Sequence, residues 1–270
     1  MSTKTKSKIN NKIHIGSYAF EVALVAFMVL FSIIMLYPLI NVISISLSSP
    51  AMISSGKVTW LPKEITFTGY EIVFGQGTIW TAYLNTIKYA VTFAVVNLFI
   101  TSLIAYSILI PDFVLRKPLT IFLLITMFFS GGTVPTYLVV RNMGLMNTMW
   151  ALVFPGAVSA YNVFVYRAFY KGISLEIREA ARIDGAGEAA ILFRIYMPLS
   201  KALYATFGLF AIVGMWNSYF DALLYIKDET KQPIQMVLRS ILFSSGATGG
   251  TFDGVNQLVQ SGKLNPKNVQ

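Results

Sequence analysis

The feature that most constrains this chain is a series of apolar runs. A helix needs about 20 apolar residues to cross the hydrocarbon core of a bilayer. Runs of this length lie at residues 19–43, 81–109, 119–140, 149–169 and 202–224. The chain is 55% hydrophobic and only 12% charged, whereas a soluble domain is about 25% charged. The sequence therefore predicts an all-α membrane protein, a single transmembrane domain over residues 1–270 with five spanning helices.

The distribution of Lys and Arg predicts the orientation of these helices. A basic tail, residues 1–17, precedes the first run, which is too long for the core of a cleavable signal and is not followed by a small-residue cleavage site. Lys and Arg also gather in the turn after the second run and in the polar stretch 170–201. Cytoplasmic loops collect these residues. The tail, that turn and that stretch are predicted to be cytoplasmic, and segment 226–270 external.

Helix-breaking residues lie inside two of the predicted spans. Gly131-Gly132 and Pro135 predict a kink or local unwinding in the third span, and Pro155-Gly156 lies in the fourth. In a bilayer such a break is tolerated only where it packs on protein or lines a cavity. In the fifth span, Gly214 and Ser218 are four residues apart and offer a small-residue face for close helix packing.

The polar stretch 170–201 is the only long charged interruption deep in the apolar sequence. Its composition predicts a short helix, a glycine turn and a second short helix outside the bilayer. Ser174 is a good N-cap for the first helix. Gly185 can take the left-handed conformation that ends it, while Asp184 is an alternative cap for the helix that follows.

Charges and apolar residues follow the same helix–turn–helix pattern. Arg182 lies near the end of the first helix, where a cation is favoured, and Glu179 can pair with it at i,i+3. The second helix is expected to stop at Pro198. Its apolar side is formed by Ile191, Leu192 and Ile195.

Ten residues of this stretch form a recognisable pattern, namely Glu179, Ala180, Ala181, Asp184, Gly185, Ala186, Phe193, Ile195, Met197 and Pro198. The pattern resembles the EAA loop of bacterial ABC-importer permeases. In that family the loop forms a coupling helix that docks into a cleft on a cytoplasmic ATPase. The alternative is an amphipathic hairpin on the membrane surface. Such a hairpin would be expected to contain more Lys and aromatic residues, and it would not need an Asp-Gly turn.

The resemblance extends to nearly the whole chain. The segments 37–44, 129–132 and 216–219 look like the carbohydrate-uptake branch (MalG-like and LplC/YtcP-like), and within it like permeases for complex, often uronic-acid-containing oligosaccharides. It implies the type I importer fold (MetI-like). Related permeases have a sixth helix, for which no apolar run remains after Leu224. Truncation is the favoured explanation, and a working five-span chain is the alternative.

The resemblance also implies partners and residue roles. The partners are a second permease subunit, two ATPase chains that hold ATP and Mg, an external solute-binding protein, the oligosaccharide and membrane lipid, but no nucleic acid. The location is a bacterial cytoplasmic membrane with the N-terminus inside. The coupling residues would be Glu179, Ala180, Ala181, Arg182, Asp184, Gly185 and Ala186, with small side chains entering the ATPase groove and Glu179 and Asp184 as polar anchors.

The sequence lacks the residues of an enzyme. It has no G-x-x-x-x-G-K-[ST] phosphate loop, no cysteine, and one histidine, His14, in the polar tail. No paired-carboxylate, Ser-His-Asp or metal-ligand arrangement is present, so no catalytic residue, metal site or cofactor is predicted. A chain that cannot hold ATP must receive its conformational energy from a partner.

Polar residues at the end of the fifth run are candidates for a substrate path. Asn217 and Asp221 are four apart, hence on one face of a continuous helix, with Trp216 and Tyr219 nearby. They fit a sugar-facing or gating patch, because ionisable groups in a bilayer usually face a cavity or a partner. The alternative, an interhelical hydrogen bond or, for Asp221, the interfacial end of a helix, is the favoured interpretation.

The sequence thus predicts the transmembrane subunit of an ATP-driven oligosaccharide importer. Two alternatives stay open at this point. The same architecture can carry a non-sugar solute, and a chain of this kind can be a membrane scaffold without transport activity.

Overall fold

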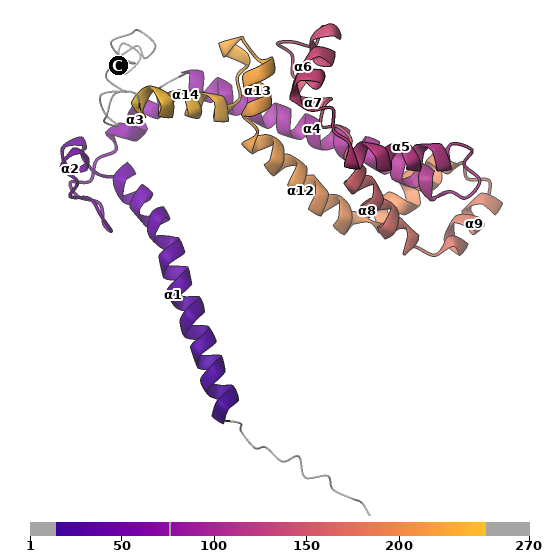
Figure 1. Cartoon of the computed structure of the whole chain (residues 1–270), viewed down its shortest axis with the longest axis horizontal. Coiled ribbons are helices and arrows are strands. Elements are labelled where there is room, and N and C mark those ends of the chain that lie inside the picture. The colour runs from indigo at the N-terminus through magenta and orange to yellow at the C-terminus, as the bar shows by residue number, and fades with distance from the viewer. Residues whose placement is uncertain (1–14, 76, 247–270) are drawn as a thin grey trace, which may run out of the picture. The chain divides into compact units, whose positions relative to one another are not determined.

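A computed structural model describes residues 15–75 and 77–246 of the 270-residue chain. The described residues form helices joined by short loops (Figure 1). They fall into two compact units, one within residues 15–75 and one within residues 77–246. Most of the predicted cytoplasmic tail and the last part of the predicted external segment, residues 1–14 and 247–270, lie outside the described residues.

The first unit is dominated by one long apolar helix, α1 (Ile15–Ser46), which has Pro38 in its interior. Its side chains from Phe20 to Ile40 are all exposed in the isolated chain. Two short helices follow, α2 (Pro50–Ser54) and α3 (Thr68–Phe74).

The loop between these short helices is held against the end of α1. The hydroxyl of Ser44 donates to the carbonyl of Trp60 at 2.8 Å. The ring centroids of Tyr37 and Trp60 lie 4.7 Å apart. The loop after the first predicted span is therefore partly ordered.

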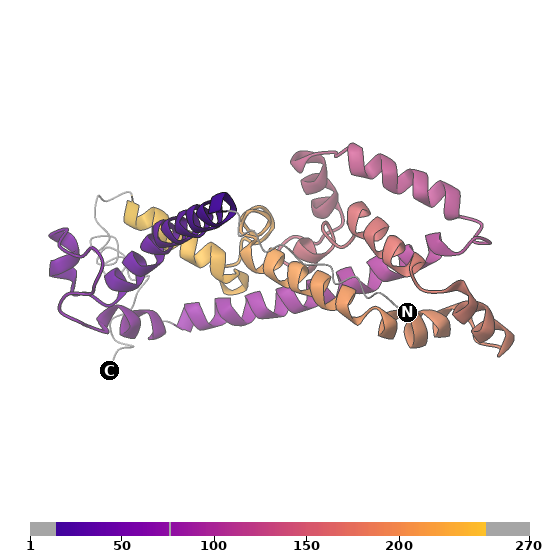
Figure 2. The same cartoon turned by 90° about the horizontal axis from the view of Figure 1, so that it is seen from below.

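The second unit is built on α4 (Gly77–Leu109), a helix of 33 residues. Helices α8 (Ala160–Lys171) and α12 (Lys201–Asn217) pack along it, as Figure 2 shows from below. Helix α5 (Arg116–Phe128) also contacts it. The buried side of α4 consists largely of small residues such as Ala90, Ala94 and Ala105. Small residues let neighbouring helix backbones come close, which makes α4 the centre of this unit.

One end of the second unit has its own small core. It contains α6 (Thr133–Asn142), α7 (Trp150–Val153) and α13 (Phe220–Tyr225), followed by the 3-10 turn η2 (Glu229–Lys231) and α14 (Ile234–Gly246). The segment around η2 is tied to α4, because the hydroxyl of Tyr89 donates to the carbonyl of Lys231 at 2.8 Å and the amide of Asn85 to that of Thr230 at 2.8 Å.

The helix break predicted in the third apolar run is confirmed, and the fourth run is broken as well. Helix α5 ends at Phe128 and α6 begins at Thr133, with Gly132 at φ 84° between them. In the fourth run, α7 ends at Val153 and α8 begins at Ala160. Glycine is the residue that adopts positive φ without strain, so the sequence places the first of these breaks correctly.

The fifth run is not the continuous helix that the sequence predicts. Helix α12 ends at Asn217, Ser218 is extended, and α13 begins at Phe220. The side-chain amide of Asn217 donates back to the carbonyl of Val213 at 2.9 Å. Asn and Ser side chains compete for backbone hydrogen bonds and favour helix ends, which gives the physical reason for the break.

Helices α1 and α4 are each long and apolar enough to cross a membrane. A third candidate is the pair of helical segments 188–199 and 201–217, which meet at an angle of 83°. The count of five spans remains a prediction from the sequence.

Candidate functional site

The polar stretch 170–201, here called the hairpin, folds as a helix, a glycine turn and a second helix. Its first arm is α9 (Leu175–Ile183). The hydroxyl of Ser174 caps α9 by accepting the N–H of Glu176 at 3.3 Å. Gly185 has φ 83°, and the N–H of Ala186 donates to the carbonyl of Ala181 at 2.9 Å across the turn. The predicted cap and turn are confirmed.

The second arm consists of α10 (Glu188–Ile191), the π-helical segment η1 (Leu192–Tyr196) and α11 (Met197–Leu199). Its N-cap is Gly187, so the alternative that Asp184 caps this arm is wrong. The arm also continues one residue past the end predicted at Pro198. The α-helical hydrogen-bond pattern is interrupted just before this proline, which has no N–H to donate.

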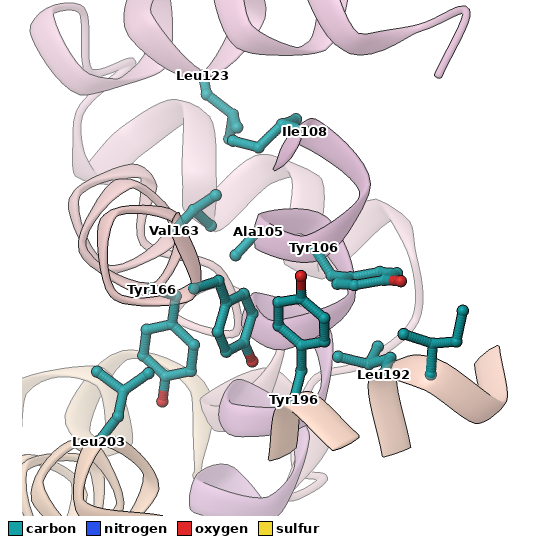
Figure 3. Close-up of a cluster of buried hydrophobic side chains, with 11 residues drawn as sticks. Ala105, Tyr106, Ile108, Leu123, Val163, Tyr166, Leu192, Tyr196 and Leu203 are labelled. Atoms are coloured by element: carbon teal, nitrogen blue, oxygen red, sulfur yellow. The ribbon is translucent and has the colours of Figure 1, made fainter. Parts of the chain in front are cut away.

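Apolar and aromatic side chains fix the second arm to the rest of the unit. Ile191 and Leu192 are fully buried and Ile195 is half-buried, as predicted for one side of this helix. Figure 3 shows the ring of Tyr196 beside Tyr106 of α4, and the two ring centroids lie 5.1 Å apart. The hairpin therefore projects from a packed core.

An ion pair and a tyrosine hydroxyl join the two arms of the hairpin to α4. Arg178 of α9 donates from Nη2 to Oε1 of Glu188 at 2.6 Å and from Nε to Oε2 at 3.3 Å. The hydroxyl of Tyr106 donates to Oε2 of the same carboxylate at 2.6 Å. Arg178 is only 6% exposed. These three residues are here called the clamp.

The clamp keeps both of its charged groups ionised. Hydrogen bonding to Glu188 raises the pKa of Arg178 above its ordinary value. For Glu188, burial acts against the charged form, but hydrogen bonds from Arg178 and Tyr106 outweigh it and hold the pKa of the carboxyl below its ordinary value. A guanidinium and a carboxylate joined by two parallel bonds form a geometrically specific contact, which fixes the angle between the two arms.

The turn end of the hairpin, here called the tip, is exposed. Ile183 is 87% exposed, and Ala181 and Ala186 are half-buried on the core side. The other tip residues, all exposed, are Glu179, Ala180, Arg182, Asp184 and Gly185. The sequence predicts that Arg182 pairs with Glu179. Among the described residues its ion-pair partner is instead Glu188, at 3.9 Å, because the turn brings the second arm next to the first.

The tip presents a distinctive set of exposed groups. It combines an unpartnered apolar side chain, two exposed carboxylates and small residues that permit close approach. Over the described part of the chain, no group of His, Cys, Asp and Glu could hold a metal ion.

The candidate substrate-path residues lie where α12 gives way to α13. Because the helix breaks there, Asn217 and Asp221 do not share one helical face, and that part of the sequence argument is wrong. Trp216 contacts Tyr83 of α4 with ring centroids 6.0 Å apart, and the guanidinium of Arg239 lies 5.4 Å from the ring of Tyr219. Asp221 accepts a long hydrogen bond from Ser218 at 3.4 Å.

Residues 77–247 match the family of the binding-protein-dependent transport system inner membrane component. The chain belongs to this family. It is therefore a non-catalytic, multi-pass inner-membrane permease of an ABC transporter, it binds no cofactor, and it works in a complex with an ATPase and a binding protein.

Individual relatives place the permease among carbohydrate importers. It is 36% identical over 231 residues to the polygalacturonan/rhamnogalacturonan transport system permease protein YtcP of Bacillus subtilis, covering 85% of this chain and 81% of YtcP. It is also 36% identical over 240 residues to Protein LplC of the same organism, covering 89% of this chain and 81% of LplC.

A solved structure agrees with this assignment. A bacterial ABC transporter involved in the import of the acidic polysaccharide alginate matches with a TM-score of 0.83 and 30% identity, over 96% of this chain and 89% of that one. The permease thus has the all-helical fold of this transporter class.

The sequence alone does not predict the clamp. Arg178 and Glu188 are two of many charges in a polar stretch, and a charge in a polar stretch is usually exposed. One feature of the sequence points to it. Arg178 is three residues before Ala181, and because residues three apart share a helix face, Arg178 lies on the same face as a small apolar residue. Glu188 stands in the first turn of the second arm, where a carboxylate is favoured.

Proposed function

We propose that this permease imports oligosaccharides that contain uronic acids, and that the hairpin is its contact with the ATPase. The observation that carries the coupling role is the contrast within the hairpin. At its base, the buried guanidinium of Arg178 bonds Glu188, and Glu188 in turn accepts a hydrogen bond from Tyr106 of α4, while its tip is exposed. A hairpin held in this way transmits a displacement of its tip to α4, the longest helix of the unit.

The full assembly would contain a second permease that encloses the path with this one, two ATPase chains below and an external solute-binding protein above. The chain would act as one transmembrane domain with five spans, its N-terminus and hairpin in the bacterial cytoplasm and segment 226–270 outside. ATP would bind with Mg on the partner ATPases. Closure of the ATPases would draw the docked hairpins together and open the permease outward.

The proposed substrate class is supported by two relatives. One is named for polygalacturonan and rhamnogalacturonan transport and the other for import of an acidic polysaccharide. The segment around Trp216, Asn217, Tyr219 and Asp221 is proposed to face the sugar, since an exposed aromatic side chain and exposed polar groups lie together there.

Two glycines of the hairpin provide a matched test of the coupling role. A Cβ at either Gly185 or Gly187 meets nothing within 4 Å, but Gly185 has φ 83° whereas Gly187 has φ −72°. Gly185→Val should abolish uptake and substrate-stimulated ATP hydrolysis in vesicles that contain the assembled transporter. Gly187→Val should leave both nearly unchanged, because valine adopts negative φ without strain.

Asp184→Lys tests the same role by charge. It should block coupling while the chain still inserts into the membrane, because Asp184 is exposed and, within the described residues, takes part in no ion pair. Unchanged uptake in both the Gly185 and Asp184 variants would refute the docking role.

The substrate class is tested by stimulation of ATP hydrolysis in vesicles. The transporter is supplied with binding protein loaded with oligogalacturonates or with neutral oligosaccharides of equal length. We expect stimulation by the acidic set only; equal stimulation by neutral sugars would contradict the uronic-acid assignment.

A further inference from the structure

A second feature of the permease, separate from the hairpin, is an open pocket between α5 and α8. Its volume is about 560 Å³, within the size range of small-ligand sites. In both views of the second unit, the loop that joins α4 to α5 lies at the same end as α9 (Figures 1 and 2). The pocket is lined by Pro111, Phe113, Val114, Arg116, Lys117, Thr120, Ile121 and Arg167.

Cations dominate the polar part of this pocket. Arg116 and Lys117 begin α5, and Arg167 faces them from α8. No carboxylate is among the lining residues. Within the described ranges 15–75 and 77–246, no ion pair involves any of the three cations. The first turn of α5 contains no acidic residue either. Asp112 lies between two lining residues in the sequence, but it is not among the lining residues and forms no ion pair with the three cations in the described structure. The pocket thus concentrates positive charge.

The rim of the pocket is apolar and strongly exposed. Val114 is 90% exposed, and Ile121 is 57% exposed. Just outside the lining, Leu115 and Phe122 are 58% and 61% exposed. Exposed apolar side chains beside a cluster of cations at the end of a membrane-spanning helix match a lipid molecule, whose headgroup is charged and whose chains are apolar.

We propose that this pocket binds the phosphate headgroup of an anionic membrane phospholipid, with the acyl chains against the apolar rim. Basic pockets between transmembrane helices on the cytoplasmic side are sites for such headgroups. The proposal rests on the orientation given above, which places this end of the unit at the cytoplasmic leaflet. Neutral lipids lack the net charge that the three cations require.

A bound headgroup would also steady the hairpin. Helix α8, which carries Arg167, ends at Lys171 and leads directly into the hairpin. A phosphate held between Arg167 and the start of α5 fixes the segment from which the first arm projects. The lipid therefore acts on the position of the hairpin and not on its docking surface.

The test measures lipid retention by the assembled transporter in nanodiscs. Native mass spectrometry follows phosphatidylglycerol against phosphatidylcholine as the two lipids are titrated. We expect the double variant Arg116→Gln, Arg167→Gln to bind phosphatidylglycerol about 25-fold more weakly, from about fivefold per cation near a membrane surface. Phosphatidylcholine retention should not change.

A second pair of cations provides a control of equal charge. Arg141 and Lys227 line another open cavity of the same unit, about 390 Å³ in volume, together with Tyr137, Met146 and Asn147. The variant Arg141→Gln, Lys227→Gln should retain phosphatidylglycerol as the unmodified protein does. An equal loss in this control would show that only overall charge matters and would overturn the proposal.

Two further outcomes would also overturn it. If inorganic phosphate displaces phosphatidylglycerol at equal concentration, the pocket is a small-anion site and not a lipid site. If the Arg116, Arg167 variant keeps its lipid but loses the ATPase on purification, a protein partner covers the pocket. The coupling role of the hairpin is judged separately by the Gly185 and Gly187 variants, so either idea can fail while the other stands.

Discussion

The base and the tip of the hairpin use similar residues for opposite purposes. Arg178 and Glu179 are neighbours in the sequence, yet Arg178 is 6% exposed and bonded twice to Glu188, while Glu179 is exposed. A charge that is buried and paired holds two arms at a fixed angle, whereas an exposed charge is free for a partner. The comparison teaches that the stabilising contact and the proposed docking residue lie on different faces of one nine-residue helix.

The largest expected effect is on stability at the base. Arg178→Ala leaves the carboxylate of Glu188 without its guanidinium, and we expect a loss of about 2 kcal/mol, since hydrogen bonds to charged groups contribute roughly 1.5–3 kcal/mol and Glu188 is partly exposed. Thermal unfolding of the purified permease measures it. Glu179→Ala should change stability by less than about 0.5 kcal/mol.

If Arg178→Ala and Glu179→Ala lowered the stability by equal amounts, the comparison between base and tip would be contradicted. Arg178→Lys sharpens it, because lysine keeps the charge but cannot form the two-pronged contact. Its stability should fall between those of the unmodified protein and the alanine variant.

Tyr106→Phe should have a smaller effect on the base. It removes one hydroxyl that donates to Glu188 at 2.6 Å while leaving the ion pair, so we expect a loss of about 1 kcal/mol. Tyr161→Phe is the matched control, because Tyr161 is 61% exposed. A Tyr106 variant as stable as this control would remove the tyrosine from the clamp.

The fold and the local structure of the hairpin were largely predictable, and the clamp was not. Ser174, Gly185 and the pair Gly131-Gly132 act through their own backbone preferences, which the sequence displays directly. Arg178 and Glu188 meet only after the turn has formed, ten residues apart, so their contact is a product of the tertiary structure.

The sequence also failed where a polar side chain acted on its own backbone. Asn217 and Asp221 have the spacing of one helical face, but the amide of Asn217 bonds to Val213 and α12 ends there. An apolar run predicts that a segment enters the membrane, but it does not predict that the segment is one unbroken helix.

The pH dependence of the hairpin should be smaller than the effects of these substitutions. The pKa of Glu188 is lowered in the folded protein, so the stability that its charge provides is present above the ordinary value of 4.5 and is lost as the pH falls through the lower, folded value. The chain has no cysteine, so a single spin label at Ile183→Cys can report hairpin mobility.

We expect that label to become more mobile as the pH falls below about 4.5. In the Glu188→Gln background, which has no carboxyl to titrate there, its mobility should be raised already at neutral pH and should not change with acid. A label whose mobility is the same at every pH in both backgrounds would show that Glu188 does not hold the base.

The smallest expected effect on stability is at the tip. Ile183→Ala removes a side chain that is 87% exposed, and unfolding of the permease alone should shift by less than about 0.5 kcal/mol. Binding of the ATPase should nevertheless weaken measurably, because the apolar side chain is proposed to enter its surface. Unfolding and ATPase titration of the same preparation separate these two effects.

Sided labelling and cross-linking of the Ile183→Cys protein in the assembled transporter test the central claim most directly. In sealed vesicles, a membrane-impermeant maleimide should reach this cysteine only from the cytoplasmic side, and a short bifunctional reagent should join it to the ATPase chain. Labelling from the outer side, or a tip that forms no cross-link to any nucleotide-hydrolysing chain, would contradict the claim.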